Sequence, residues 1–257
     1  MSLLFEEETH LLRRCFFDVQ NEVGTGRQEE AYHQACMLWF AEHRLPVVSK
    51  LPHRLIVRGE EAHSLFPDFV GWDAISVELK AVPRHLSPAE FVQLFDYLKC
   101  RRDRVGLLVN MGLDRVEVER VVYDPPETEW LENWDAWTDH IDGEDRAAGR
   151  AIREALRNVY AEHTTGYGEE VLTKIVLCAL RQQGLSVTVS PLAKAFYRSV
   201  EVHELALACL VANERIVVTL SALFGTNDFN VSRGRFYLKT LDLRWAIAAD
   251  LARNERS

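Results

Sequence analysis

The chain has 257 residues, 30 basic and 39 acidic side chains and a net charge of −9, and 47% of its residues are hydrophobic. These values suit one large or two small globular domains and exclude a disordered chain. No apolar run is long enough to cross a bilayer, and the first ten residues lack the basic and apolar regions of a signal peptide. Its five cysteines are scattered without a CxxC pair, so we expect reduced thiols in a cytoplasmic protein with no membrane association.

The first half alternates helical and strand patterns. In chain order, the patterns predict helices at 4–22 and 27–43, and strands near 45–50, 53–58, 64–70 and 75–81. Residues 71–73 predict a turn that makes the last two strands a hairpin. Ser87, Pro88 and Glu90 predict a capped helix to about residue 101, and VGLLVNMG at 105–112 predicts a strand buried on both faces. This order predicts an α/β sheet covered by helices.

The strand ISVELKA, residues 75–81, places an acid and a lysine on one face, because Glu78 and Lys80 alternate with apolar residues. The predicted hairpin brings Asp68 close to Glu78. Two carboxylates and the backbone carbonyl of Leu79 are suitable ligands for Mg²⁺ or Mn²⁺. Lys80 can orient or help deprotonate a metal-bound water, or stabilise charge on a phosphate. Taken alone, such an acid–lysine pair is more often a solvated face.

Pro67-Asp68 followed by Glu78-x-Lys80 resembles the motif of the PD-(D/E)XK nuclease superfamily. Gly26-x-x-Glu29-x-x-Tyr32 looks like the signature of the GxxExxY protein family, a predicted branch of that superfamily. Gln93-x-x-x-Tyr97 resembles the QxxxY motif that follows the strand in RecB-type nucleases, and its two residues share a helix face. The resemblance covers about residues 4–122.

The resemblance implies a restriction-endonuclease-like fold, with a mixed central sheet flanked by helices, and a site for Mg²⁺ or Mn²⁺. Its implied metal ligands are Asp68, Glu78 and the Leu79 carbonyl, with Glu29 leaning into the site. Its implied catalytic residues are Lys80, Glu78, Asp68, Gln93 and Tyr97. One departure is Gln20, which stands where the family usually has a histidine before the first glycine.

The second half repeats the first at an offset of about 140 residues. GRQEEAY at 26–32 recurs as GYGEEVL at 166–172, and YLK at 97–99 recurs at 237–239. The site residues do not recur: with one residue of extra offset in the strands, the counterparts of Asp68, Glu78, Lys80 and Gln93 are Cys209, Thr219, Ser221 and Arg233. Of the helix motif, only Gly166 and Glu169 are kept, because the counterpart of Tyr32 is Leu172. We therefore expect a tandem duplication whose second copy, 146–257, is a pseudo-nuclease domain without metal.

The acidity is concentrated between the two copies. Residues 124–145 hold nine Asp or Glu and no Lys or Arg, while 1–123 carry a net −4 and 146–257 a net +4. Trp130, Trp134 and Trp137 recur at helical spacing in this linker. We expect an amphipathic helix that docks the two domains; the alternatives are a phosphate-mimicking plug and a helix that binds a protein partner.

The function that these patterns predict is metal-dependent cleavage of nucleic acid, with DNA favoured over RNA, in the domain 1–123. Arg233, Arg235 and Lys239 are candidate phosphate contacts in the second copy, although each alone is as well explained as a solvated charge. Residues 231–250 are either a helix followed by a strand or one long helix. The rival functions are a non-catalytic nucleic-acid-binding or scaffold subunit of a defence or mobile-element assembly, and a hydrolase of another phosphate ester.

Overall fold

The computed structural model of the chain describes residues 3–125, 128–138, 140–141, 143–222 and 227–251. It divides into two compact units, the first made of Met1–Leu55 and Ser64–Pro125, the second of Ile56–His63 and Pro126–Ser257. Four residues of the acidic linker, at 126, 127, 139 and 142, lie outside the described part. Among the described helices, none has the length and apolar character needed to span a membrane.

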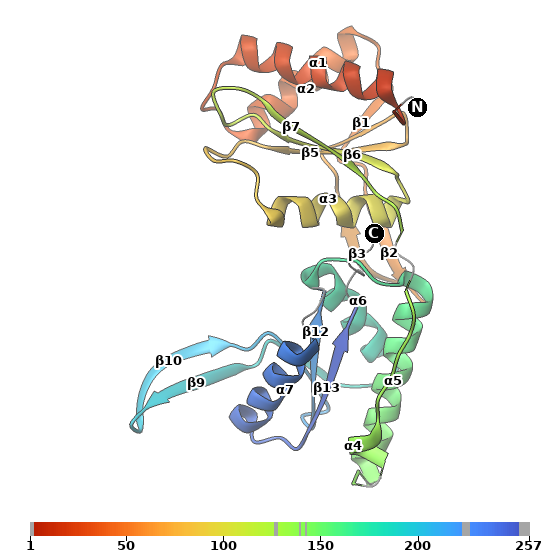
Figure 1. Cartoon of the computed structure of the whole chain (residues 1–257), viewed down its shortest axis with the longest axis vertical. Coiled ribbons are helices and arrows are strands. Elements are labelled where there is room, and N and C mark those ends of the chain that lie inside the picture. The colour runs from red at the N-terminus through yellow and green to blue at the C-terminus, as the bar shows by residue number, and fades with distance from the viewer. Residues whose placement is uncertain (1–2, 126–127, 139, 142, 223–226, 252–257) are drawn as a thin grey trace. The chain divides into compact units, whose positions relative to one another are not determined.

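The first half of the sequence forms ten elements (Figure 1). They are α1 (Glu6–Val23), α2 (Glu29–Glu42), β1 (Val47–Ser49), β2 (His53–Val57), β3 (Glu60–Leu65), β4 (Phe69–Gly71), β5 (Ile75–Lys80), α3 (Pro88–Arg101), β6 (Val105–Asn110) and β7 (Glu117–Val122). Five strands form one sheet in the order β1-β4-β5-β6-β7. The β5–β6 pair is parallel and the other neighbours are antiparallel, as predicted for a mixed sheet.

Helices cover both faces of the β5–β6 region. Phe16 of α1 and Phe40 of α2 belong to one buried core with Val77 of β5. On the other face α3 approaches β6 so closely that a Cβ on Gly106 would lie 2.9 Å from a methyl carbon of Leu94. The polar face of β5 is therefore turned toward α3 and away from solvent, and this burial makes the site unlike a surface ion pair.

Most of the predicted elements of the first half are confirmed. Ser87 and Glu90 form the predicted capping box at the start of α3, and β6 is buried along its whole length. The strand predicted at 64–70 is wrong as a single strand, because β3 ends at Leu65 and β4 begins at Phe69. Proline at 67 has no N–H to donate to a ladder, and the break leaves Asp68 at the start of β4.

The described part of the second half also forms ten elements, and after the first short helix they repeat the series from α1 to β6. They are α4 (Asp135–Thr138), α5 (Gly143–His163), α6 (Glu169–Gln182), β8 (Val187–Val189), β9 (Leu192–Tyr197), β10 (Val200–Ala206), β11 (Leu210–Ala212), β12 (Ile216–Ser221), α7 (Asn227–Leu241) and β13 (Trp245–Asp250). The sheet order is β13-β12-β11-β8, with β12 and β13 parallel. This repeats the arrangement β6-β5-β4-β1. It also shows that 231–250 is a helix followed by a strand.

The acidic linker does not form the predicted amphipathic helix. Only Asp135–Thr138 is helical between residues 128 and 138. Trp130 and Trp134 both donate their indole N–H to Glu132. Trp137 packs against Trp245 with ring centroids 5.3 Å apart and the two ring planes tilted by 45°. The tryptophan side chains therefore bind within the second unit, and the helical spacing of these residues was a misleading signal.

Glu132 holds this linker against α5 through hydrogen bonds, and its ionisation makes the stability of the fold depend on pH. Its carboxylate accepts hydrogen bonds from Nε of Arg153, at 2.6 Å, and of Arg157 on α5. Burial alone would raise the pKa of Glu132, but these hydrogen bonds outweigh it and lower the pKa to about 2. A carboxyl with a lowered pKa stabilises the folded state above its unfolded pKa, near 4.5, and loses that contribution as the pH falls.

We therefore expect Glu132→Gln to lower the free energy of unfolding by about 1–3 kcal/mol at neutral pH. The difference from wild type should shrink below about pH 4.5 and vanish near pH 2. Urea denaturation across this range measures it, with the exposed Glu129→Gln as the matched control. A difference that stays constant down to pH 2 would contradict the assignment.

Candidate active site

Two buried carboxylates face each other across the β4–β5 pair. Phe69 is opposite Val77 in the antiparallel ladder. Asp68 and Glu78, one position further along the ladder, are therefore also opposite each other. Asp68 is 9% exposed and Glu78 is 3% exposed. One oxygen of Asp68 accepts the backbone N–H of Leu79 at 2.8 Å, which fixes this carboxylate against β5.

The Glu78 carboxylate has an uncompensated oxygen. Its Oε1 accepts a hydrogen bond from the Lys80 ammonium at 2.5 Å. Its Oε2 is buried and has no hydrogen-bond partner among the residues that the structure describes. Burial, followed by the charge of Asp68, raises the pKa of Glu78 to about 8. A buried carboxylate that lacks a partner is costly, so the folded chain without a cation disfavours the charged form of Glu78.

Glu29 and Lys80 interact electrostatically with these carboxylates. Burial raises the pKa of Glu29, on α2, with Lys80 acting to lower it and Asp68 to raise it. Burial opposes the charged form of Lys80, but Glu78, Glu29 and Asp68 outweigh it and raise the pKa of this lysine. Lys80 is therefore a cation at neutral pH, and its suggested role in deprotonating water is less favoured than a role in stabilising charge.

Gln93 and Tyr97 lie on α3, as the predicted helix face requires. Gln93 Nε2 donates to the Tyr97 hydroxyl at 2.7 Å. Tyr97 is 4% exposed, and burial, followed by the charge of Glu78, raises the pKa of its hydroxyl. The neutral phenol thus remains beside Glu78, and Gln93 orients it.

A divalent cation fits this set of donors. Mg²⁺ and Mn²⁺ prefer oxygen ligands, and Mg²⁺ keeps several of its waters, so one or two protein carboxylates suffice. Oε2 of Glu78 has no partner among the residues described, and burial raises the pKa values of Glu78, Asp68 and Glu29. A bound cation would therefore stabilise the charged form of these carboxylates. No three His, Cys, Asp or Glu residues in the described part are grouped closely enough to form a metal site by themselves. The cation would therefore rest on two carboxylates and water, with Glu29 farther away.

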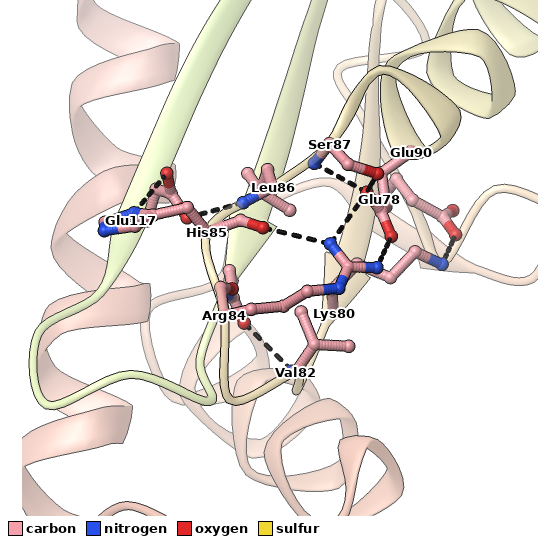
Figure 2. Close-up of polar contacts among 10 residues, drawn as sticks. Glu78, Lys80, Val82, Arg84, His85, Leu86, Ser87, Glu90 and Glu117 are labelled. Atoms are coloured by element: carbon pink, nitrogen blue, oxygen red, sulfur yellow. Dashed lines mark hydrogen bonds and ion pairs between the residues drawn. The ribbon is translucent and has the colours of Figure 1, made fainter.

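The loop that leaves β5 is tied down by a residue that the sequence analysis missed. Asn110 Oδ1 accepts the backbone N–H of Val82 at 3.1 Å, and Asn110 Nδ2 donates to the carbonyl of Arg84 at 2.8 Å. Figure 2 shows this loop beside the Glu78–Lys80 pair, with the Arg84 side chain bound to Glu90 of α3 at 2.6 Å. A polar residue in an otherwise apolar strand was the available signal, because buried amides require partners.

His33 is a second residue near the site that the motif search did not single out. It lies one helical turn after Glu29 and stacks on Phe69 with ring centroids 4.6 Å apart. Its Nε2 is 3.0 Å from Ser49 Oγ, and its buried Nδ1 has no partner among the described residues. Its position four residues after Glu29, on the same helix face, was the signal.

Two other motif residues have structural roles. Gln20 donates to the carbonyls of Met111 and Leu113 at 3.0 and 2.9 Å, which ties α1 to the end of β6. The Tyr32 hydroxyl donates to the carbonyl of Gly24 at 2.8 Å, and its ring is fully buried. Tyr32 is thus a core aromatic with a hydroxyl partner, and it closes the α1–α2 turn.

In the second unit an arginine side chain occupies the corresponding site. The Arg233 guanidinium, on α7, lies 3.5 Å from Glu169 and donates to Asn230 Oδ1 at 3.0 Å and to the carbonyl of Leu220. Glu169 is the counterpart of Glu29, and Leu220 is the counterpart of Leu79. A fixed cationic side chain therefore contacts the same two positions that were predicted to approach a metal ion in the first unit.

The three candidate phosphate contacts therefore differ in their surroundings. Arg233 is directed toward internal partners, and its side chain is 13% exposed. Arg235 and Lys239 are exposed on the same helix. Only the latter two are placed as an external cationic surface would require, and their binding of nucleic acid stays a prediction.

The comparison with protein families agrees with this geometry. A family model described as the PD-(D/E)XK nuclease superfamily matches residues 6–121 and again residues 146–252. The two matches confirm the predicted duplication. Searches of the curated proteins and of the solved structures gave no match.

Proposed function

Because the chain belongs to the PD-(D/E)XK nuclease superfamily, we propose that it is a divalent-metal-dependent nuclease with its active site in the first unit. The observation that carries this proposal is the buried, unpartnered Oε2 of Glu78 beside Asp68 and Lys80. A structural role would not require an acid here, since the fold keeps the same strand in the second unit with Thr219 in its place.

Asp68 and Glu78, with the Leu79 carbonyl, would hold Mg²⁺ or Mn²⁺. When bound, such an ion polarises a phosphate and lowers the pKa of a bound water. Asp68 is held by the Leu79 N–H and Glu78 by burial, so both are preorganised for binding.

The other residues act on the substrate side. Lys80, kept protonated by the surrounding carboxylates, would orient the attacking water or stabilise the negative charge that develops on the phosphate. Tyr97, oriented by Gln93, would donate a hydrogen bond at the same place. Lys80 at the end of β5 and Tyr97 on α3 would thus present a cationic and a neutral donor to an anionic ester.

The second unit has a different role in this proposal. It carries no counterpart of Asp68, Glu78 or Lys80, and Arg233 supplies the charge that its remaining acid needs. We propose that it is a pseudo-nuclease domain that contributes binding of the backbone through Arg235 and Lys239 and does not cut.

A cleavage assay on the purified chain tests the function and its substrate together. Labelled single- and double-stranded DNA and RNA are incubated with Mg²⁺ or Mn²⁺ and, in parallel, with EDTA. We expect cleavage with a divalent ion, none with EDTA, and none with Lys80→Ala, while Arg104→Ala, an exposed cation of the same unit, remains active. Cleavage in EDTA would contradict the metal dependence. Binding of these substrates without cleavage would favour a nucleic-acid-binding subunit instead.

A further inference from the structure

The tip of the β2–β3 hairpin is an integral part of the second unit, where residues 56–63 bind the ends of two helices. The carbonyl of Val57 accepts a hydrogen bond from Gln182 of α6 at 2.7 Å. The backbone N–H of Arg58 donates to Glu162 of α5 at 2.9 Å. Val57 is fully buried. A hairpin tip on an α5–α6 surface is therefore an established contact of this fold.

The β9–β10 hairpin is the counterpart of β2–β3. Its turn, Arg198–Ser199, has φ values of 46° and 67°, and the matching turn Arg58–Gly59 has φ values of 46° and 88°. Two consecutive positive φ values are typical of the tight turn in a two-residue hairpin. The two hairpins thus have the same tip, 140 residues apart.

Unlike its counterpart, the β9–β10 tip has no cover. Phe196, Tyr197, Val200 and Val202 are each 60–65% exposed. Figure 1 shows this hairpin extending away from α7 and from the sheet of its own unit. An isolated two-stranded hairpin is marginally stable in water, and contiguous exposed apolar side chains mark interaction surfaces. The exposed apolar side chains of this tip therefore indicate that it binds an apolar surface.

The surface that would match it is on the first unit. The helices α1 and α2 are the counterparts of α5 and α6, and the counterpart of Glu162 is the exposed Glu22. On α2, Leu38 is 68% exposed, and Ala31 is exposed where its counterpart Val171 is only 5% exposed. The first unit thus has the same helix pair that binds the hairpin tip in the second unit, and apolar residues on this pair are exposed.

The differences between the two helix pairs agree with the differences between the two tips. His163 donates to the carbonyl of Ile56 at 2.9 Å, but its counterpart is the apolar Val23. Gln182 is replaced by Glu42, which cannot donate. The polar contacts of the first hairpin would thus be fewer here, and Ile56 and Val57 are replaced by the larger Phe196 and Tyr197. In the matching contact, Glu22 and Glu42 would face Arg198. The result is a more apolar contact with a complementary charge.

We propose that the tip of the β9–β10 hairpin binds the α1–α2 surface of a second copy of this chain, with Phe196 and Tyr197 on Leu38 and Arg198 beside Glu22. The two surfaces are different patches, so the contact is heterologous and builds a ring or a filament. The partner is another copy because the repeat itself supplies the geometry: the β2–β3 hairpin of the first repeat binds the helix pair α5–α6 of the second, and α1–α2 is the same helix pair in the first repeat.

Sedimentation velocity on the full chain, across a range of concentrations, tests the proposal. We expect wild type to associate, and Tyr197→Asp and Leu38→Arg each to weaken association on the order of tenfold or more. Both side chains are exposed, so neither change should affect folding; Leu131→Ser, at a site 80% exposed, is the control that should associate like wild type.

A mixing experiment gives the sharper result. Tyr197→Asp chains keep intact helices and Leu38→Arg chains keep an intact hairpin. An equimolar mixture should therefore form 1:1 complexes at concentrations at which each variant alone is monomeric. Arg198→Glu and Glu22→Arg should each weaken association and should restore it when combined. A monomeric wild type at every concentration, or an association that Leu38→Arg leaves unchanged, would overturn the proposal.

Discussion

Glu78→Gln is expected to abolish cleavage and, at the same time, to make the metal-free protein more stable. The loss of activity should be roughly 10²–10³-fold or more, because a catalytic metal supplies several kcal/mol of stabilisation in the transition state. The gain in the free energy of unfolding should be about 1–3 kcal/mol. These opposite signs are the signature of a residue kept for function at the expense of the fold.

The physical reason lies in the burial of this carboxylate. Glu78 is 3% exposed, its Oε2 has no partner in the described part of the chain, and Asp68 is close by. Glutamine keeps the shape of the side chain and removes the charge that burial disfavours. The same change removes a carboxylate that the proposed cation needs.

Thermal unfolding with and without Mg²⁺ or Mn²⁺ separates the two effects. A ligand that binds the folded state raises its stability, so the ions should raise the Tm of wild type and leave that of Glu78→Gln unchanged. Glu119→Gln, at an exposed position on β7, should behave like wild type in every assay. Lower stability of Glu78→Gln without metal would show that Glu78 has a structural role.

Arg233→Gln is expected to destabilise the second unit by about 2–3 kcal/mol and to leave the metal dependence of cleavage unchanged. The guanidinium has charge-assisted hydrogen bonds to Leu220 and Asn230 and lies close to Glu169, and such bonds contribute about 1.5–3 kcal/mol. Glutamine is the residue at the matching position of the first unit, Gln93, so the backbone can accept it.

Denaturation monitored by tryptophan fluorescence measures this effect, since the described tryptophans of the linker and Trp245 lie in the second unit. Arg235→Gln is the matched control, because Arg235 is exposed on the same helix and should cost little. If Arg233→Gln were as stable as Arg235→Gln and bound nucleic acid more weakly, Arg233 would be the phosphate contact that the sequence first suggested.

Sequence patterns predicted the elements whose formation depends on interactions between neighbouring residues. The alternation in residues 75–81 and the capping box at Ser87 identified β5 and the start of α3, since both depend on neighbouring residues. The burial of Glu78 could not be predicted in this way, because it depends on α3 packing over β5. The spacing of Trp130, Trp134 and Trp137 failed for the same reason: Glu132, Arg153 and Arg157 hold this segment against α5.

The internal repeat supplied the long-range information that a single copy lacked. It aligned Glu78 and Lys80 with Thr219 and Ser221 and so predicted a second unit without the acid–lysine pair. It did not predict that Arg233 would turn inward, since the alignment shows which residue replaces Gln93 but not where its side chain points. Neither did it single out Asn110, whose partners are backbone groups of a loop.

The arginine in the second unit has a consequence for the molecule in an environment poor in metal. The second unit has its cation as part of the chain, on Arg233. The first unit, as proposed, binds a cation from solution, which neutralises Glu78 and Asp68. Chelation would then act on a single half, loosening the first unit while the second remains folded. Two copies of one ancestral fold would thus differ in what they require from their surroundings, and the metal supply would control the proposed nuclease unit without affecting the stability of the second unit.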